Sequence, residues 1–490
     1  MVSEFDRIAH EHAAKPAVFW GEDEISYGSI QAKSARLARH LLDQGVQAGD
    51  RVGIWMKNRP EFIVALYGIM RAGGVAVPVN NFLKPDEVSF IASDAGFKAC
   101  VSEEGMKDGL AIVGEANPAM VKVFVESIES LPEATMMGSD RKRDELAVII
   151  YTSGTTGKPK GAMLSHGNLL HNVASCRDVL AVVEGDRFAL LLPMFHSFML
   201  CVCIVLPLSV GATIVLVKSL HPPKNIIQEI VIRKATILPC IPQLFRTLAA
   251  NPPGIELPLR LCVSGAAPLP AEILKEFGDR LGIPLLEGYG LSEASPVVSM
   301  NPIDGKWKPG SIGIPIPGVE VKIVDDAGKE LPAEEAGELC VRGGNVMQGY
   351  WNKPEATAST IKEDWLYTGD VARKDSDGYI YITDRKKDML LVNGINVYPR
   401  EIEEVLYSFE GVKEAAVVGQ KDKRRGELPV AFVSLNEGVT IEPEKIVDYV
   451  RGKMADYKVP RKVFVLDALP KNATGKILKT DLRDRPEVQV

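Results

Sequence analysis

The chain has 490 residues, of which 46% are hydrophobic and 25% charged, and its formal net charge is −7. This length exceeds what one hydrophobic core usually supports, so we expect a soluble globular protein of two or more domains. The negative balance argues against nucleic acid as the main partner. The seven cysteines form no C-x-x-C pair, which favours reduced, buried thiols in a cytoplasmic protein over a disulfide framework or a zinc site.

Residues 1–6 are acidic and lack an apolar core, so no secretory signal is expected. Residues 198–217 carry no charge and are long enough to be read as a membrane span. Pro207 and Gly211 interrupt this stretch, which favours a buried helix, a turn and a core strand at 213–217. We therefore expect no transmembrane segment, while a peripheral membrane contact stays open.

Short β-branched runs alternate with helical stretches over the first three quarters of the chain, as is typical of layered α/β domains. After about residue 318 the pattern changes to hairpin-like strands. The predicted elements are strands at 51–55 and 74–79 around a helix at 61–72, a buried strand at 259–264, and strands at 319–324 and 337–342. The strand at 259–264 ends in Gly265 and Ala266, whose small size lets a flat ligand approach the backbone.

A polar loop follows the apolar run at 146–151. Its eleven residues, 151–161, contain three glycines, four serine or threonine hydroxyls and two lysines. Glycines let backbone N–H groups approach phosphate oxygens, hydroxyls donate further bonds, and lysines offset charge, so the loop predicts polyphosphate binding. A Walker P-loop is excluded, because Thr152 stands where its first glycine should be and Pro159 follows Lys158. The candidate phosphate-binding residues are Thr152, Ser153, Gly154, Thr155, Thr156, Gly157, Lys158 and Lys160.

A charged run at 384–388, without an apolar anchor, precedes a unit of about a hundred residues. In that unit Pro399 is placed to start a helix that carries Ile402, Val405 and Leu406 on one face. Strands are expected at 415–418 and 430–434. A charged linker between two foldable units is a natural pivot. We therefore predict an N-terminal domain of residues 1–384 and a mobile C-terminal domain of residues 385–490.

Four further motifs follow the loop in a fixed order. They are Gly-Tyr-Gly-Leu-Ser-Glu at 288–293, Trp-Leu-Tyr-Thr-Gly-Asp at 365–370, Thr-Asp-Arg-Lys-Lys-Asp at 383–388 and Pro-Lys-Asn-Ala-Thr-Gly-Lys at 470–476. With the loop, they resemble the adenylate-forming superfamily of acyl-CoA synthetases, peptide-synthetase adenylation domains and luciferases. The resemblance implies an α/β fold: a large layered N-terminal domain with mixed sheets and a small β-barrel-like part, plus a small mobile α+β C-terminal domain. It also implies ATP, Mg²⁺ and coenzyme A.

The resemblance assigns the nucleotide site residue by residue. The loop would hold the β- and γ-phosphates, and Glu293 would bind Mg²⁺, beside Ser292 in a position where threonine is common. Tyr289, between Gly288 and Gly290, would stack on adenine. Gly265 and Ala266 would also border the nucleotide. Asp370 would bind the ribose hydroxyls, and Arg385 the ribose-phosphate edge.

The resemblance also implies the catalytic groups. Lys476, in a glycine-containing loop of the mobile domain, would stabilise the charge that develops as the carboxylate attacks the α-phosphate. His196 matches a gate beside the substrate carboxylate, and Lys387 matches the hinge. Gly394 would leave room for the pantetheine arm of CoA. A basic cluster of Lys421, Lys423, Arg424 and Arg425 fits either the CoA phosphates or a solvated surface equally well.

An acyl-CoA synthetase is preferred within this superfamily. No carrier-domain motif follows Lys476, and no insertion that would block domain rotation separates residues 318 and 384. A non-enzymatic nucleotide sensor would tend to lose Lys476 or Glu293, and both are present. The oligomeric state stays open, with a homodimer as one option.

The acid is expected to be a medium- or long-chain fatty acid, because the candidate pocket is apolar and Gly290 leaves its floor open. An aryl or alicyclic acid is the alternative substrate, and an adenylate-only acyl-AMP ligase is the alternative activity. The candidate pocket residues are Phe198, Met199, Val263, Gly290, Pro296 and Val297.

Overall fold

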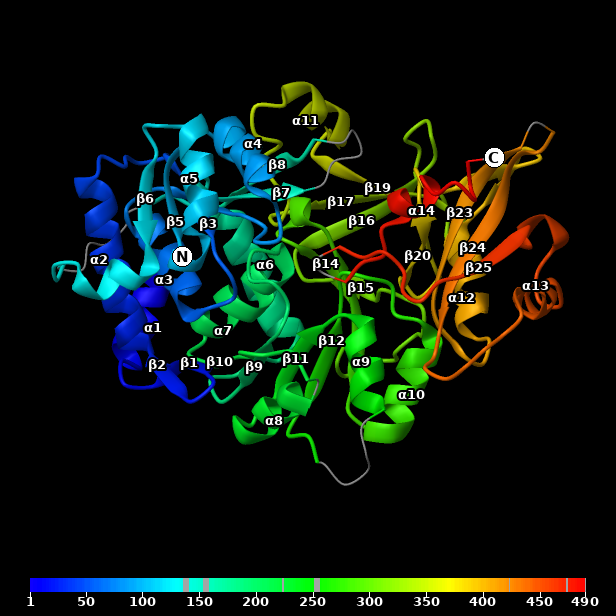
Figure 1. The fold of residues 1–490 in the computed structure, drawn as a ribbon, viewed down its shortest axis with the longest axis horizontal. Coiled ribbons are helices and arrows are strands. Elements are labelled where there is room, and N and C mark those ends of the chain that lie inside the picture. The colour runs from blue at the N-terminus through cyan, green and yellow to red at the C-terminus, as the bar shows by residue number, and fades with distance from the viewer. Residues whose placement is uncertain are drawn as a thin grey trace.

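The computed structural model describes residues 1–134, 141–152, 158–222, 224–250, 256–422, 424–472 and 475–489. These residues form sheets of nine and six strands, a five-stranded sheet after them, and a second five-stranded sheet near the C-terminus. Helices cover the sheets and connect parallel strands (Figure 1). The predicted α/β class with mixed sheets is therefore confirmed.

The six-stranded sheet is parallel except for its edge strand β8. Parallel strands need long crossovers, and helices α3, α4 and α5 provide them. Strand β3 and helix α3 confirm the predicted strand at 51–55 and helix at 61–72 to within one residue. In sheet order, the strands are β6 (Val121–Phe124), β5 (Phe97–Ser102), β3 (Arg51–Trp55), β4 (Val75–Pro78), β7 (Leu146–Thr152) and β8 (Lys160–Ser165). The helices are α2 (Tyr27–Asp43), α3 (Pro60–Arg71), α4 (Pro85–Ala95) and α5 (Lys107–Ala116).

The nine-stranded sheet has a parallel centre and antiparallel strands at both ends. Its central parallel strands are mostly buried, which matches their largely apolar sequence. In order, the strands are β15 (Ile314–Pro315), β14 (Val297–Met300), β13 (Leu285–Gly290), β12 (Leu261–Ser264), β11 (Ile237–Cys240), β9 (Arg187–Leu190), β10 (Thr213–Leu216), β1 (Pro16–Trp20) and β2 (Asp23–Ser26). Its helices are α1 (Val2–Glu11), α6 (His166–Val179), α8 (Lys224–Ile232), α9 (Pro242–Ala249) and α10 (Ala271–Leu281).

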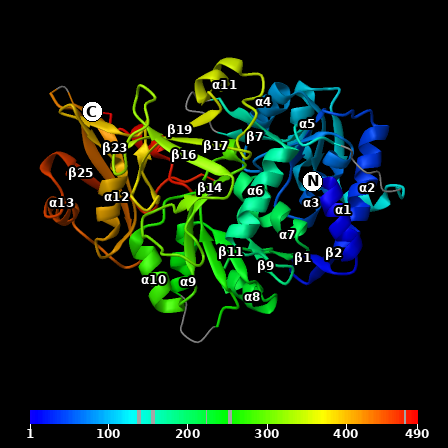
Figure 2. The ribbon, with the colours of Figure 1, turned by 180° about the vertical axis from the view of Figure 1, so that it is seen from behind.

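The uncharged stretch at 198–217 folds as a buried helix, a turn and a strand, as predicted. A π-helical segment, η3 (Met199–Val205), continues into the short helix α7 (Leu206–Ser209), and β10 follows. Helix α6 packs against η3, α7 and β14 (Figure 2). None of the described helices is both long and apolar enough to cross a membrane.

The two smaller sheets bring the C-terminal part next to the nine-stranded sheet. The first is a half-barrel of β16 (Val319–Val324), β17 (Gly337–Gly343), β19 (Trp365–Lys374), β18 (Ile361–Lys362) and β20 (Ile380–Arg385), with α11 (Pro354–Thr360) beside it. The second contains β22 (Ile395–Val397), β21 (Leu390–Val392), β24 (Gly426–Leu435), β23 (Val412–Asp422) and β25 (Lys462–Val465). Helices α12 (Pro399–Tyr407), α13 (Pro443–Arg451) and α14 (Lys479–Arg483) accompany it, and Pro399 starts α12 as predicted.

The charged run at 384–388 has polar anchors at both ends, which the absence of an apolar anchor in the sequence did not reveal. Asp384 accepts hydrogen bonds from the backbone N–H groups of Arg385 and Arg400, at 2.7 and 2.9 Å. Asp388 pairs with Arg483 at 2.5 Å, and both aspartates are buried. Only the middle of the run is exposed. Strand β20 ends at Arg385, and the short turn to β21 is the pivot that we predict.

Candidate functional site

A cavity of about 760 Å³ lies where the sheets meet the C-terminal part. This volume is in the range of small-molecule sites. Strands β7 and β8, the carboxyl ends of β12 and β13, the half-barrel strand β19 and the turn around Lys476 all contribute to its wall. The predicted residues that line the cavity are Thr152, Lys160, His196, Phe198, Val263, Gly265, Ala266, Gly288, Tyr289, Gly290, Ser292, Glu293, Pro296, Val297, Asp370, Arg385, Lys387 and Lys476.

Some predicted residues lie elsewhere. Met199 is fully buried at the start of η3 and does not line the cavity. Lys158 is exposed, with its ammonium 5.6 Å from the centre of the Phe90 ring. Gly394 lies in the turn between β21 and β22, also away from the cavity. Ser153, Gly154, Thr155, Thr156 and Gly157 lie outside the described residues, as does Lys423 of the basic cluster.

Asp370 is fixed by two neighbours at one end of the cavity. The Tyr289 hydroxyl donates a hydrogen bond to its carboxylate, and Arg385 Nε lies 3.4 Å from Oδ1. Asp370 and Arg385 are cross-strand partners on β19 and β20, so the antiparallel register sets their separation. The bond from Tyr289 ties the end of β13 to the half-barrel. A carboxylate oriented in this way suits a vicinal diol such as ribose.

Glu293 and Ser292 form a second polar group, on the 3₁₀ turn that follows β13. The Tyr350 hydroxyl donates to Glu293 Oε1 at 2.8 Å, and the Oγ atoms of Ser292 and Ser197 are 3.1 Å apart. Lys160 Nζ lies 5.2 Å from the centre of the Tyr350 ring. A cation, a carboxylate and hydroxyls thus line the same part of the cavity.

Burial changes the protonation of His196 and Lys476. Burial, with the positive charge of Lys476 nearby, lowers the pKa of His196 to about 4, so its imidazole is neutral near pH 7. Burial, then repulsion from Arg385, lowers the pKa of Lys476 to about 8, against the opposing effects of Asp370 and Asp388. Lys476 therefore remains mostly cationic at neutral pH. Its backbone N–H donates to Asn472 Oδ1 at 2.9 Å, which orders the turn that presents it.

The apolar side of the cavity is built around Phe198. A Cβ atom built on Gly265 would lie 3.2 Å from the Phe198 ring, so this glycine lets the ring pack against the end of β12. The next residue, Ala266, has a φ of 65°, a left-handed conformation that costs about 1–2 kcal/mol outside glycine. This conformation turns the backbone along the cavity, where Val263 and Gly265 also line the wall.

Gly290 has a different role from the one that the sequence suggested. A Cβ atom at this position would lie 2.3 Å from the Pro296 carbonyl oxygen and 3.1 Å from Val297 Cα. The glycine is therefore required for the pairing of β13 with β14, at the point where their register shifts. A larger side chain here would first displace the neighbouring backbone. The interpretation of Gly290 as an open pocket floor is corrected accordingly.

Several polar residues of the cavity were not found from the sequence. Tyr350 reaches Glu293 from a loop far along the chain, and no spacing of residues signals that contact. Asn472 stands inside the motif at 470–476, where an amide before a glycine turn is a recognisable turn former. The other unpredicted polar lining residues are Asn80, Tyr151, Ser197, Ser264, Glu338, Ser359, Thr360, Tyr367, Thr368 and Lys386.

The chain matches the AMP-binding enzyme family over residues 5–351 and the AMP-binding enzyme C-terminal domain over residues 401–476. A long-chain-fatty-acid–CoA ligase of Bacillus subtilis is 35% identical, over 96% of this chain and 91% of its own length. A feruloyl-CoA synthase of Amycolatopsis sp is 34% identical, over 96% of this chain and 95% of its own.

Solved structures of related enzymes have the same fold. ATP-bound MatB from Rhodopseudomonas palustris superposes with a TM-score of 0.91 at 33% identity, covering 99% of this chain and 98% of its own. The anthranilate CoA ligase AuaEII, in complex with anthranoyl-AMP, superposes with a TM-score of 0.92 at 29% identity, covering 100% and 97%. The chain therefore belongs to the AMP-binding enzyme family, as an AMP-forming acid–CoA ligase that works through an acyl-adenylate.

Proposed function

We propose that the acid is a medium- or long-chain fatty acid. The observation that carries this proposal is the apolar wall formed by Phe198, Val263, Pro296 and Val297 at one side of the cavity. The charged lining residues are Lys160, Glu293, Glu338, Asp370, Arg385, Lys386, Lys387 and Lys476, and we assign them to ATP or to pairs among themselves. The B. subtilis relative supports the same class.

Adenylation is the first half-reaction. One oxygen of the substrate carboxylate attacks the α-phosphorus of ATP, the bond to the bridging oxygen breaks, and pyrophosphate leaves with that oxygen. Negative charge grows on the α-phosphoryl oxygens during this step. We assign its stabilisation to the Lys476 ammonium, because a preorganised cation in an enclosed site acts more strongly than in water. The neutral His196 beside it is a hydrogen-bonding group that adds no charge.

The cavity is also suited to Mg²⁺, a hard cation that proteins commonly bind through one or two carboxylates together with substrate phosphates. The Glu293 carboxylate faces the cavity, and one of its oxygens accepts a hydrogen bond from Tyr350 that fixes its direction. Ser292, the neighbouring residue, and Tyr350 add hydroxyl oxygens at this point of the cavity. Glu293 would hold the ion, which would supply charge neutralisation for the triphosphate.

Thioester formation is the second half-reaction. The CoA sulfur attacks the acyl carbon of the adenylate, the carbon–oxygen bond to phosphate breaks, AMP leaves, and the thiol proton passes to solvent. In the structure Lys476 occupies the cavity and Gly394 lies outside it. We propose that rotation about Lys387 exchanges the two, which brings the β21–β22 turn to the adenylate. Lys421, Arg424 and Arg425 stand on or next to the β23–β24 hairpin and are candidates for the CoA phosphates.

A substituted aromatic acid is the second candidate. The Phe198 ring lines the cavity beside Gly265, and the aromatic ring of a substrate can pack against it there. The feruloyl-CoA synthase of Amycolatopsis sp, at 34% identity, supports this alternative.

Initial rates over a panel of C2–C18 aliphatic acids and benzoate- and cinnamate-like acids test the proposal. We expect pyrophosphate release and acyl-CoA formation that need ATP, Mg²⁺ and CoA, with the highest kcat/KM among aliphatic acids of medium or long chain. A maximum on aryl acids would replace the proposal by the second candidate. Acyl-AMP that accumulates and is not consumed by CoA would indicate an adenylate-only ligase instead.

The seven cysteines are free and buried. Such thiols persist in a reducing compartment, so we also propose a cytoplasmic location. Fractionation of the native cells checks it.

A further inference from the structure

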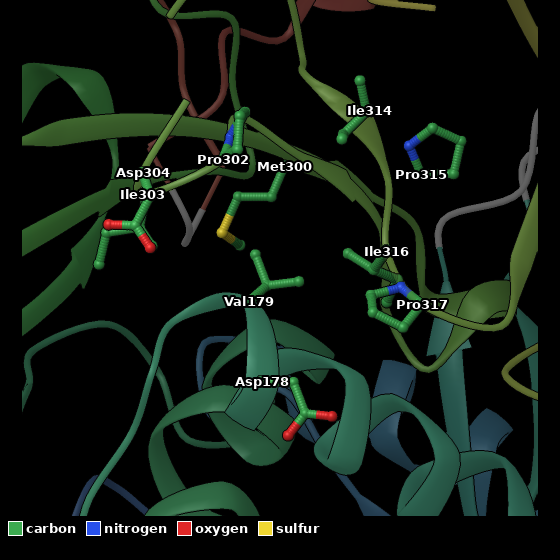
Figure 3. Close-up of a pocket in the computed structure, with 10 residues that line it drawn as sticks. All are labelled: Asp178, Val179, Met300, Pro302, Ile303, Asp304, Ile314, Pro315, Ile316 and Pro317. Atoms are coloured by element: carbon green, nitrogen blue, oxygen red, sulfur yellow. The ribbon is translucent and has the colours of Figure 1, made fainter. Parts of the chain in front are cut away.

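A second cavity of about 350 Å³ lies beside the first, between the end of α6 and strands β14 and β15 (Figure 3). Its walls are mainly apolar: Val179 from α6 faces Ile314 and Ile316 from the β15 segment. This volume is at the lower end of the range for small-molecule sites. None of the groups that we assign to ATP lines it, so it needs another explanation.

Met300 is the residue that lines both cavities. It is 2% exposed, and on the sheet it stands between Gly288 and Ile314, its partners on β13 and β15. Gly288 borders the first cavity and has no side chain; a Cβ there would lie 3.3 Å from Met300 Cε. Ile314 borders the second cavity. The Met300 side chain therefore stands between the first cavity, at Gly288, and the second cavity, at Ile314.

A methionine at this position can move where a branched residue could not. Its unbranched side chain has three rotatable bonds and adapts to irregular space. Strand positions otherwise favour β-branched residues, which are stiff at χ1. The wall between the cavities is thus made by a flexible side chain.

We propose that Met300 determines specificity for long acyl chains: the tail of a long acid displaces the Met300 side chain and enters the second cavity. The proposal rests on the assignment of the protein as a fatty-acid ligase. Short acids are bound entirely within the first cavity, so Met300 keeps its place. Longer acids gain additional burial beyond it, at about fourfold in kcat/KM for each methylene group.

The rim of the second cavity also predicts which chemical group is preferred at the ω end of the acyl chain. Asp178 and Asp304 line the cavity and place their carboxylates at its exposed rim. A methyl terminus is accommodated by the apolar walls, whereas an ω-carboxylate is repelled. The expected ligand class is therefore a long monocarboxylic acid, and not a dicarboxylic acid of the same length.

The test compares the ratio of kcat/KM for a C16 acid to that for a C8 acid in several variants. Met300→Ile keeps an apolar side chain of similar size but stiffens it, and Val179→Trp fills the second cavity from α6. Each should lower the ratio at least tenfold, equivalent to losing two or more buried methylenes. Met300→Ala, which opens the wall, should keep or raise the ratio. Val183→Trp is the matched control, because Val183 is 59% exposed and lies outside both cavities.

A C16/C8 ratio that stays within twofold of the wild type in both Met300→Ile and Val179→Trp would overturn the inference while leaving the fatty-acid assignment intact. A wild-type enzyme that uses aryl acids but no aliphatic acid would overturn that assignment itself, and the inference with it. As a second readout, hexadecanedioic acid should be a poorer substrate than hexadecanoic acid, and Asp178→Asn combined with Asp304→Asn should narrow the difference. A dicarboxylic acid used equally well by the wild type would contradict the placement of the tail.

Discussion

At the scale of single residues, the protonation of Lys476 links structure to activity. Its pKa of about 8 is below the ordinary value because of burial and Arg385. For an amine with a lowered pKa, the cationic form dominates below that pKa and is lost above it. The neighbouring His196, with a pKa of about 4, stays neutral from pH 5 upward. Of these two groups only Lys476 changes its charge between pH 7 and 9, so we assign a loss of adenylation in this range to Lys476.

We predict that kcat/KM for adenylation declines above about pH 8, because kcat/KM reports ionisations of the free enzyme. Lys476→Ala should slow adenylation by about 10²–10³-fold, the usual cost of one lost charge stabiliser, while conversion of pre-made acyl-AMP to thioester stays near normal. Pyrophosphate release against pH, with the two half-reactions measured separately, checks both statements.

Lys476→Arg provides the control, since arginine stays charged at every accessible pH. Its residual adenylation should show no decline between pH 8 and 9.5. A wild-type profile that stays flat to pH 9.5, or a decline that persists in the arginine variant, would assign the ionisation to another group. Equal loss of both half-reactions in Lys476→Ala would leave this lysine a structural role.

At the scale of elements, the turn between β20 and β21 is the pivot that we propose. The N–H groups of Asp388 and Met389 both donate to the Arg385 carbonyl oxygen, at 2.9 and 3.1 Å, so the turn is compact. Lys387 is its exposed middle. The two anchors lie on either side of it: Asp388 pairs with Arg483 inside the C-terminal part, whereas the bond from the Arg400 N–H to Asp384 crosses the turn. A rotation about this turn would therefore break the Asp384–Arg400 bond and keep the Asp388–Arg483 pair.

We predict that Lys387→Pro impairs thioester formation while adenylation stays within a few-fold of the wild type. Proline fixes φ of its own residue and restricts the residue before it, which opposes the change of backbone conformation that a rotation requires. Single-turnover assays of each half-reaction measure the effect. Lys387→Ala is the control: it removes the side chain that lines the cavity but keeps the backbone free. If proline and alanine variants behave alike, the side chain rather than the pivot is responsible.

The helices and strands also show which parts of the fold could be predicted from the sequence. The sequence predicted the strands at 51–55 and 213–217 and the helix that begins at Pro399. These elements are determined by the local pattern of apolar residues and by the proline itself. The role of Gly290 was misread, since the direction of its missing side chain depends on a shift in strand register that no local pattern reveals. The anchoring of the charged run was missed for a similar reason. Its partner Arg483 comes from a helix almost a hundred residues away.

At the scale of the whole molecule, a buried ion pair joins the two predicted domains. Arg400 of α12 lies 3.8 Å from Glu287 of β13, both are largely buried, and Glu404 lies 4.0 Å from the same guanidinium. The backbone N–H of Leu269 donates to Glu287 Oε1 at 3.0 Å. A second link runs from Arg246 of α9 to the Lys413 carbonyl oxygen at 2.6 Å. These contacts hold the C-terminal part in the arrangement that places Lys476 in the cavity.

The protonation of Glu287 makes this arrangement sensitive to pH when its partner is removed. Burial raises the pKa of Glu287 to about 7 even though Arg400 opposes the shift. A carboxylate with a raised pKa binds more protons when buried than when exposed, so burying it becomes less favourable as pH rises from its unfolded value to about 7. In the wild type Arg400 compensates the charge above pH 7. Without Arg400, an unpaired carboxylate would remain in the interface.

We predict that Arg400→Met slows adenylation at least tenfold at pH 8 and much less at pH 6, because breaking a buried pair by removal of one partner costs about 3–5 kcal/mol. Thioester formation from pre-made acyl-AMP should be affected little, since that step uses the rotated arrangement. Adding Glu287→Gln to Arg400→Met removes the unpaired charge and should restore most of the adenylation rate at pH 8, which double-mutant kinetics would show. Two outcomes would contradict this prediction: a double variant as slow as Arg400→Met, or equal slowing of both half-reactions at both pH values. In either case the ion pair would stabilise the fold in general and would not hold one arrangement of the two domains.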